Sequence, residues 1–385
     1  MQEFFEFRLI PRVLYKAGLV AEMGAELSSL GATKGFIVTD AGLVKSGLVE
    51  QVQQALAETI EIVGVYSDVP PNSSVAVVEA AAAQAREAGA DLLIALGGGS
   101  PIDTAKAMRI VITEGGNLLD YEGINVLERR LIPMVAIPTT AGTGSEASNF
   151  AVIKDEVNNV KLSFTSPYLA PELAILDPQV TQSLPPHLAA ATGMDALTHG
   201  FETYVSTEAE PMSDALALGA IEIVSNYLRD ATHHGPTNEE ARGQMLIASC
   251  MAGIAFTNSY LGAVHALAHA TGGHFPLHHG LLNSIFLPHV VAFNANTVPD
   301  RYARIARAFG INTGGRSREE VIDDLIAGLR QLASDCGLIT QLRDLGIPKD
   351  ALPMLAEQAF SDGAVYHNPL APSVEDLLGI LQAAW

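Results

Sequence analysis

At 385 residues the chain is longer than one compact core usually supports, so we expect two domains. Hydrophobic residues make up 48% of the chain and charged residues 17%, a composition that argues against wholesale disorder. The formal net charge of -21 would repel a nucleic-acid backbone or an anionic membrane surface, so neither is expected as a partner. The negative charge does not argue against small-molecule ligands.

The N-terminal segment MQEFFEFRLIP contains Glu3 and Glu6 and lacks a basic segment followed by an apolar run, so it does not resemble a secretory signal. We find no stretch of about 18 uncharged apolar residues, which argues against a membrane span. A cytoplasmic protein is therefore expected. Cys250 and Cys336 form no CxxC unit and are expected to be core residues rather than a disulfide or a zinc site.

Short β-branched runs alternate with Ala-rich stretches in the first half of the chain. Strands are predicted over 35–39, 60–66, 92–96 and 134–137, and a helix over 75–88. This alternation predicts a parallel sheet covered by helices, with ligands beyond the carboxyl ends of the strands. A β-hairpin is predicted from 150–153 and 160–164, separated by the polar turn 154–159.

The pattern changes after residue 178, where Ala, Leu and Met recur at helical spacing through 188–204, 214–228 and 240–255. Pro185-Pro186 marks a boundary near 181–186. We therefore expect an α/β N-terminal Rossmann-like parallel-sheet domain over 1–183, followed by an all-α helical domain over 184–385.

A glycine-rich segment, GGGSPIDTAK (97–106), directly follows the predicted strand 92–96. Glycines let a pyrophosphate approach the backbone, and the N-terminus of a following helix favours an anion. We expect Ser100 as the N-cap of this helix, Pro101 as its first residue and Asp103 as the partner in a capping box. The predicted phosphate site comprises Gly97, Gly98, Gly99 and Ser100. A well-capped connection without a ligand is the alternative, since the GxGxxG fingerprint is absent.

A second loop of small residues, PTTAGTGSE (138–146), would lie beside the first loop in a parallel sheet. Asp40 ends the first predicted strand, where it could accept a ribose hydroxyl and would repel a 2′-phosphate. This position favours NAD over NADP. The alternative role for Asp40 is a helix N-cap.

Histidines are concentrated at ligand spacing in the helical half. Asp195 and His199 are four residues apart and so lie on one helix face, and His265 and His269 repeat that spacing. Buried carboxylates and imidazoles are costly unless they are paired or bind a cation. The predicted ligands of a divalent metal are Asp195, His199, His265 and His279. Ligand type alone does not choose between iron(II) and zinc.

The remaining histidines of this region receive lesser roles. His269 is expected to support the ligands or to transfer a proton, as a catalytic residue. His274 and His278 are expected to be neighbours without a role of their own.

Together these motifs resemble those of the iron-containing alcohol dehydrogenase family, which includes lactaldehyde reductase, 1,3-propanediol dehydrogenase and microbial butanol and methanol dehydrogenases. The resemblance covers nearly the whole chain. The matching segments are GGGS (97–100) with Asp103 and Lys106, PTTAGTGSE (138–146), GMDA (193–196) with His199, and His265 with HG (279–280).

The resemblance implies an α/β nucleotide-binding domain, a helical domain and a metal at the cleft, held by the four ligands named above. It also implies the surroundings of the dinucleotide, which are Asp40, Asn72, Gly98, Gly99, Asp103, Thr139, Thr140 and Lys161, with Thr143 in the same loop as the threonines. The chain departs from the family at Asn368-Pro369-Leu370, where Asn-Pro-Arg is common, so a role for that basic residue does not carry over.

The expected activity is an NAD-dependent alcohol dehydrogenase or aldehyde reductase acting on a small primary alcohol or diol. The cation, most simply Fe2+ with Zn2+ as the alternative, would lower the pKa of the alcohol hydroxyl. Phe150 and Phe256 either line an apolar substrate pocket or belong to the core. The family suggests a homodimer or larger homo-oligomer.

Two other functions stay open. One is a glycerol-dehydrogenase-like or dehydroquinate-synthase-like enzyme of the same superfamily, and the spacing of the four ligands favours the alcohol dehydrogenases over it. The other is a non-catalytic metal- or nucleotide-binding protein, which would bind the cofactor without turning over any alcohol.

Overall fold

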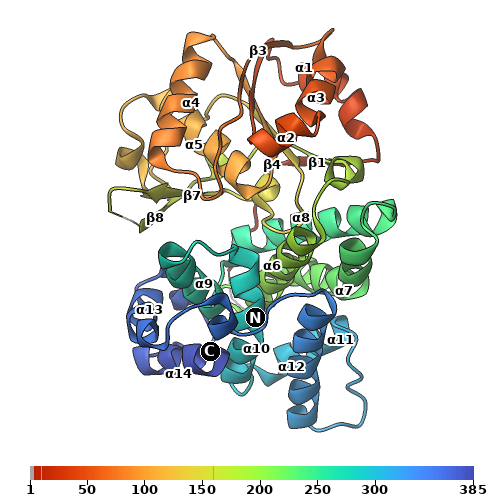
Figure 1. The fold of residues 1–385 in the computed structure, drawn as a ribbon, viewed down its shortest axis with the longest axis vertical. Coiled ribbons are helices and arrows are strands. Elements are labelled where there is room, and N and C mark those ends of the chain that lie inside the picture. Colours follow the sequence, from red (N-terminus) through yellow and green to blue (C-terminus); the bar gives the residue numbers. More distant parts are fainter. Residues whose placement is uncertain (1–3, 10, 159) are drawn as a thin grey trace. The chain divides into compact units, whose positions relative to one another are not determined.

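The computed structural model describes residues 4–9, 11–158 and 160–385. The chain forms two compact units. The α/β unit comprises Leu9–Thr140 and Gly144–Leu184, and the helical unit comprises Met1–Arg8, Ala141–Thr143 and Pro185–Trp385. Figure 1 colours them by sequence, with the α/β unit from red to yellow and most of the helical unit from green to blue.

A six-stranded parallel sheet forms the centre of the α/β unit. Its strands, in spatial order, are β1 (Arg12–Tyr15), β9 (Leu173–Leu176), β6 (Met134–Pro138), β4 (Leu92–Gly97), β2 (Lys34–Val38) and β3 (Glu61–Tyr66). The chain runs from β2 to one edge and then returns from β4 toward the other edge. The strand order therefore reverses between β2 and β4, and ligands of open α/β sheets bind at such a point.

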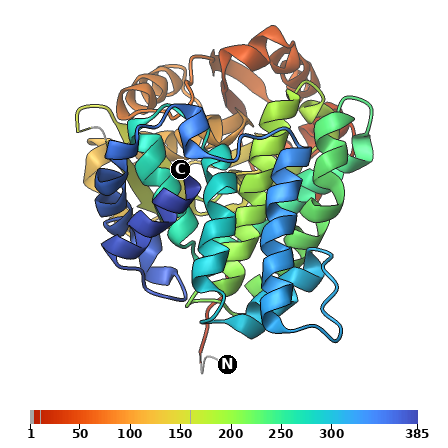
Figure 2. The same ribbon diagram turned by 60° about the horizontal axis from the view of Figure 1, so that its bottom comes forward.

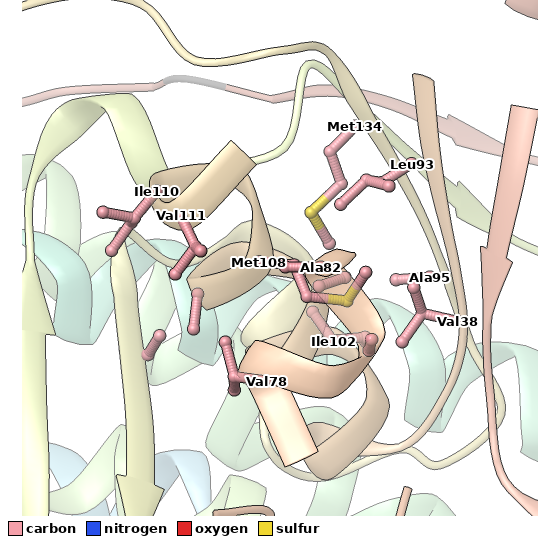
Figure 3. Packing of buried hydrophobic residues seen from close by; sticks show 14 of the residues in the cluster. Val38, Val78, Ala82, Leu93, Ala95, Ile102, Met108, Ile110, Val111 and Met134 are labelled. Carbon is pink, nitrogen blue, oxygen red and sulfur yellow. The ribbon is translucent and has the colours of Figure 1, made fainter. Parts of the chain in front are cut away.

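Side chains alternate between the two faces of this sheet, as the period of a strand requires. On one face Val38, Leu93 and Ala95 pack against α4 (Val75–Glu87) and α5 (Gly99–Glu114) (Figure 3). On the other face the intervening residues pack against α1 (Gly24–Ser28) and α3 (Leu48–Leu56), which lie near the short α2 (Ala41–Lys45). Both faces of the strands are covered, which explains their nearly continuous apolar sequence.

A second, smaller sheet completes the unit. Its strands are β5 (Gly123–Ile124), β8 (Val160–Thr165) and β7 (Phe150–Asp155), and β7 pairs with β8 in antiparallel fashion. The predicted hairpin is confirmed, although Asn159 of its turn lies outside the described residues. The short 3-10 helices of this unit are η1 (Leu19–Glu22), η2 (Leu118–Tyr121), η3 (Ser145–Ala147), η4 (Pro167–Leu169) and η5 (Pro178–Thr181).

Helices build the other unit, and Figure 2 shows several of the longer ones side by side. They are α6 (Pro186–Val205), α7 (Pro211–His233), α8 (Glu239–Ser259), α9 (Ala263–His274), α10 (His279–Asn294), α11 (Pro299–Ala308), α12 (Arg318–Asp335), α13 (Leu352–Phe360) and α14 (Val374–Ala384). Three 3-10 helices lie among them: η6 (Leu342–Leu345), η7 (Lys349–Ala351) and η8 (Gly363–His367).

Helix α6 is the centre of this unit and packs against α7, α8 and α10. Every residue from Ala190 to Val205 is buried, so the helix has no solvent-exposed face over that length. A glycine permits a close approach between α6 and α7, because a Cβ atom at Gly193 would lie only 2.3 Å from Cδ1 of Leu228. The polar side chains of α6 are consequently enclosed by other helices. The predicted fold class, a parallel-sheet α/β domain followed by a helical one, is confirmed.

Cys250 and Cys336 are both buried and form no disulfide with each other or with any described residue, as expected of core residues. Within the described part of the chain, no single helix has the length and apolar composition needed to cross a membrane. The pair α8 and α9, bent by 102°, meets that criterion only when the two are counted together.

Candidate active site

The glycine turn lies at the reversal of strand order, at the carboxyl end of β4. Gly97 has φ 152°, and a Cβ atom there would lie 2.5 Å from Cγ of Pro101, so only glycine fits. Gly98 adopts an extended conformation and forms the N-cap, and α5 begins at Gly99. The first N–H groups of this 16-residue helix lack partners within the helix and are suited to an anion.

The predicted cap at Ser100 is wrong by two residues. Ser100 lies inside the first turn of α5, and its hydroxyl accepts a hydrogen bond from the N–H of Asn72 at 3.1 Å. Asp103 forms no capping box, because its carboxylate accepts from Ser145 Oγ at 2.5 Å and from Val152 N–H at 3.0 Å. Because Gly98 and Gly99 carry no side chain, α5 begins at Gly99, before the serine that was predicted to cap it.

Asp40 follows β2 and caps α2. Its Oδ1 accepts from the N–H groups of Gly42 at 2.8 Å and Leu43 at 3.1 Å, so the N-cap that was the alternative role is formed. Both bonds end on Oδ1. The cap therefore does not use Oδ2, which a ribose hydroxyl could reach.

A buried lysine joins the two small-residue loops. Lys106 is fully buried, and its Nζ donates to Ser145 Oγ and Ser148 Oγ at 3.0 Å each and to the carbonyl of Phe150 at 2.6 Å. Burial lowers the pKa of Lys106 to about 8, against the opposing charge of Asp103, whose Oδ1 lies 3.8 Å away. Lys106 thus connects α5, the helix that follows the glycine turn, to the end of the second loop.

The structure places most of the predicted dinucleotide contacts in the α/β unit. Thr139 N–H donates to the carbonyl of Gly97 at 3.0 Å, and a Cβ atom at Gly98 would lie 3.1 Å from Oγ1 of Thr140. Lys161 is on β8 and is near enough to lower the pKa of Asp103, although burial raises that pKa overall. Thr143 differs, since it belongs to the helical unit.

In the helical unit, three imidazoles surround one carboxylate oxygen. The Nε2 atoms of His199, His265 and His279 lie 3.8, 3.8 and 3.9 Å from Oδ1 of Asp195. Ligand atoms about 2.0–2.2 Å from a tetrahedral zinc or iron ion are separated by roughly 3.3–3.6 Å, so a small inward movement would complete a metal site. Ligand atoms of Asp195, His265 and His279 all lie within 4.8 Å of one another, whereas His199 is outside this group of three, with its Nε2 3.8 Å from Oδ1 of Asp195.

Hydrogen bonds on the far side of two rings aim their Nε2 atoms inward. His199 Nδ1 lies 3.2 Å from the carbonyl of Gly142, and His265 Nδ1 lies 2.5 Å from Oε2 of Glu202. A ring that donates through Nδ1 presents an unprotonated Nε2 to a cation. Burial lowers the pKa of His199 to about 4, so this ring is neutral. Burial would also lower the pKa of His265, but Glu202 outweighs it and raises that pKa.

Glycine also determines how closely the third imidazole approaches. His279 begins α10, and a Cβ atom on the next residue, Gly280, would lie 2.1 Å from the carbonyl oxygen of Ala191 and 3.0 Å from Cβ of Asp195. Only glycine therefore lets α10 approach α6 closely enough for His279 to reach the carboxylate.

The other predicted residues take up separate positions. His269 bonds through Nδ1 to Oδ2 of Asp362 at 2.9 Å, and its ring stacks on that of His279 with centroids 5.2 Å apart. His274 bonds to Gln358 and His278 is the N-cap residue of α10, so neither joins the ligand cluster.

The two phenylalanines lie in different units. The ring of Phe256, on α8, lies 4.7 Å from that of His199. Phe150 begins β7 in the α/β unit.

Three residues of the site were missed in the sequence: Glu202, Asn283 and Asp362. The first two carry a helical signal, because Glu202 is three residues after His199 and Asn283 is four after His279. Asp362 lies 93 residues from His269, and no local pattern joins them.

The α/β unit thus contains a parallel sheet with a glycine turn, and the helical unit contains an Asp-His cluster of the kind that suits a divalent cation. Residues 11–178 match the family described as iron-containing alcohol dehydrogenase, and residues 189–385 match its C-terminal region. The chain belongs to the iron-containing alcohol dehydrogenase family. The predicted enzyme class, an NAD-dependent alcohol dehydrogenase or aldehyde reductase, is confirmed.

Named relatives cover almost the whole chain. The NAD-dependent methanol dehydrogenase of Bacillus methanolicus is 37% identical over 378 residues, which is 98% of this chain and 99% of that protein. The lactaldehyde reductase of Escherichia coli K12 is 36% identical over 370 residues, 96% of each. The crystal structure of a 1,3-propanediol oxidoreductase superposes with a TM-score of 0.97 at 36% identity and covers 100% of both chains.

Proposed function

We propose that this protein interconverts a small primary alcohol or diol and the corresponding aldehyde, with NAD as the cofactor. A divalent cation would be held by Asp195, His199, His265 and His279. The observation that carries this assignment is the convergence of three Nε2 atoms on Oδ1 of Asp195 at 3.8–3.9 Å. When bound, the cation lowers the pKa of the alcohol hydroxyl and polarises the aldehyde carbonyl.

The family description supports Fe2+ as that cation, with Zn2+ as the alternative, because one carboxylate and three imidazoles suit both ions. The hydrogen bonds from His199 to Gly142 and from His265 to Glu202 would hold the ligands in place before the ion arrives. Less reorganisation is then needed on binding.

The dinucleotide would bind at the glycine turn. Its pyrophosphate would accept hydrogen bonds from the first N–H groups of α5, where no Cβ atom of Gly97 or Gly98 obstructs it. Asp40 has Oδ2 left for a ribose hydroxyl and would repel a 2′-phosphate, which supports NAD over NADP. Asn72, Gly99, Ser100, Asp103, Thr139, Thr140, Thr143 and Lys161 are proposed to complete these surroundings.

His269 is proposed to pass the alcohol proton outward. Asp362 bonds to its Nδ1, which leaves Nε2 as the atom that exchanges a proton. Burial would raise the pKa of Asp362, but His269 and the N–H of Ala364 outweigh it and lower that pKa to about 2. The carboxylate therefore remains charged at any working pH and can stabilise a protonated imidazole.

A small, uncharged substrate fits the apolar ring of Phe256 beside His199. By their names, relatives of similar identity act on methanol, 1,3-propanediol and lactaldehyde, and others on choline and long-chain alcohols. The superfamily alternatives, a glycerol-dehydrogenase-like or dehydroquinate-synthase-like enzyme, receive no comparable support.

We also propose a cytoplasmic homo-oligomer. Two buried cysteines without a disulfide suit a reducing compartment. In the α/β unit Leu9 and Tyr15 are 64% and 47% accessible, and Tyr15 belongs to β1, an edge strand of the sheet. Exposed apolar side chains beside an open sheet edge commonly mark an interface.

The test is a panel of short primary alcohols mixed with NAD and protein purified without air, followed by absorbance of the reduced cofactor. We expect turnover by the wild type and loss of both metal and turnover in His265→Ala. His274→Ala, outside the cluster, should behave as the wild type. Full activity of metal-stripped His265→Ala would refute the proposal, and cofactor binding without any turnover would indicate a non-catalytic binding protein.

A further inference from the structure

Asn283 lies within the proposed metal site, although no motif of the sequence pointed to it. It is on α10, one turn after His279, and is 0% exposed. Its Nδ2 donates to Oδ1 of Asp195 at 2.7 Å and lies 3.1 Å and 3.2 Å from Nε2 of His265 and His279. One amide nitrogen thus faces three of the four proposed ligand atoms.

These contacts and a bound cation exclude each other. An imidazole Nε2 has a single lone pair, which either accepts a hydrogen bond or binds a metal ion. An ion that takes the lone pairs of His265 and His279 therefore removes two acceptors from the Asn283 amide. The positively polarised N–H groups would then face a cation, which is electrostatically unfavourable.

The amide oxygen of Asn283, in contrast to its nitrogen, could bind a cation. Oδ1 of Asn283 is buried and has no hydrogen-bond partner among the residues that the structure describes. Rotating the amide about its last side-chain bond exchanges Oδ1 and Nδ2 without moving the backbone. An oxygen would then face the ion, and carbonyl oxygens are good ligands for hard divalent cations.

We propose that Asn283 is a further metal-site residue, whose amide turns over when the cation binds so that Oδ1 becomes an additional oxygen donor. The inference rests on the metal site of the proposed function. The amide Nδ2 lies 2.7, 3.1 and 3.2 Å from the ligand atoms of Asp195, His265 and His279. An additional donor would also favour an ion that accepts more than four ligands over tetrahedral Zn2+.

The test uses Co2+ as a probe, because four-coordinate Co2+ absorbs visible light more strongly than five-coordinate Co2+. We expect Asn283→Leu, which has no oxygen donor, to strengthen the visible band relative to the wild type. Asn283→Asp has the same shape but replaces the NH2 by an anionic oxygen. It should bind Co2+ at least tenfold more tightly in a chelator competition and should melt at a lower temperature than the wild type when metal-free.

Asn294 provides the matched control, since it is on the same helix, is 1% exposed, and has an amide that bonds to the side chains of Asn368 and Tyr302, neither of which is a proposed ligand. Asn294→Leu should lower the melting temperature and leave the Co2+ spectrum unchanged. If Asn283→Leu leaves the band unchanged, or Asn283→Asp binds no more tightly, Asn283 only packs against the site and the inference is wrong.

The inference and the proposed function can fail separately. Wild-type binding of Co2+ that is lost in His265→Ala but insensitive to Asn283 overturns only the inference. A wild type that binds no Co2+, Zn2+ or Fe2+ overturns both.

Discussion

The carboxylate of Glu202 holds the imidazole of His265 from behind. Oε2 lies 2.5 Å from Nδ1 of that ring, and Oε1 accepts from the N–H of Val264 at 2.6 Å. Glu202 is on α6, between the turn that carries His199 and the end of the helix, and is 4% exposed. The same helix therefore supplies two proposed ligands and the group that orients a third.

Replacing Glu202 by Gln should lower metal affinity by about 10–100-fold, the usual effect of losing a carboxylate behind a histidine ligand. A chelator competition with Zn2+ measures it. Glu210→Gln is the control, because Glu210 is equally buried but only caps α7. Equal affinities of Glu202→Gln and the wild type would show that His265 needs no such support.

Gly280→Ala should displace α10 from α6 and weaken metal binding together with stability. Its Cβ atom would meet the carbonyl oxygen of Ala191 at 2.1 Å, and such overpacking typically costs about 1–3 kcal/mol. Thermal melting and metal titration measure the two effects. Gly273→Ala on α9 meets no atom within 4 Å and should be tolerated. Unchanged metal binding in Gly280→Ala would mean that His279 is not held by this contact.

Asp362→Asn should lower turnover by about 10–100-fold and leave metal content unchanged, because the amide no longer stabilises a protonated His269. Steady-state kinetics and metal analysis measure both. Asp300→Asn, an exposed position, serves as the control. Loss of metal with turnover would instead assign Asp362 to the metal site.

Glu146 predicts a pH dependence of stability. It is 1% exposed, and burial raises its pKa from the ordinary 4.5 to about 7. Between these values the folded protein binds a proton that the unfolded chain has released, so stability falls as the pH rises from about 4.5 to 7. Glu146→Gln cannot ionise and should lose this slope.

Melting temperatures of both proteins at pH 5 and pH 8 check this. The variant should gain relative to the wild type at pH 8, and an equal difference at both values of pH would contradict the prediction. Glu172→Gln is not a suitable control, since Glu172 pairs with the buried Arg109, whereas the exposed Glu375 is suitable.

Gly97→Ala should weaken NAD binding at least about tenfold. The backbone φ of 152° and the 2.5 Å approach to Pro101 leave no space for a methyl group, so the turn must shift beneath the pyrophosphate. Fluorescence titration with reduced cofactor measures this, and Gly379→Ala on α14 is the control. Unaltered affinity would place the cofactor elsewhere.

The sequence predicts strands and helices best where the pattern is long. Strands β2, β4 and β6 are bounded by turn residues, and α6 to α8 repeat apolar residues at helical spacing. The four-residue strands β1 and β9 were not predicted, because so short a run carries no period and they are defined by pairing with each other across the chain. The predicted N-cap at Ser100 was wrong. The Ser100 hydroxyl instead accepts a hydrogen bond from the N–H of Asn72, which is 28 residues away in sequence.

The candidate site follows the same division. Asp195 and His199 lie close together because residues four apart share a helix face, whereas His265 and His279 reach Asp195 from α9 and α10 through tertiary packing. The groups that orient them come from tertiary packing: Gly142 reaches His199 from another segment, and Asp362 reaches His269 from η8. A periodic pattern in the sequence cannot predict these contacts between residues that are distant in the chain.

The three residues Ala141–Thr143 belong to the helical unit although the chain on both sides of them belongs to the other. A Cβ atom at Gly142 would meet Thr192 O at 2.4 Å, and the Gly142 carbonyl faces Nδ1 of His199. A helical fragment that begins at Pro185 would therefore lack the Gly142 carbonyl, which bonds to the proposed ligand His199. If the first 184 residues were exchanged as an independent module, Gly142 would be exchanged with them, and with it the carbonyl that bonds to His199.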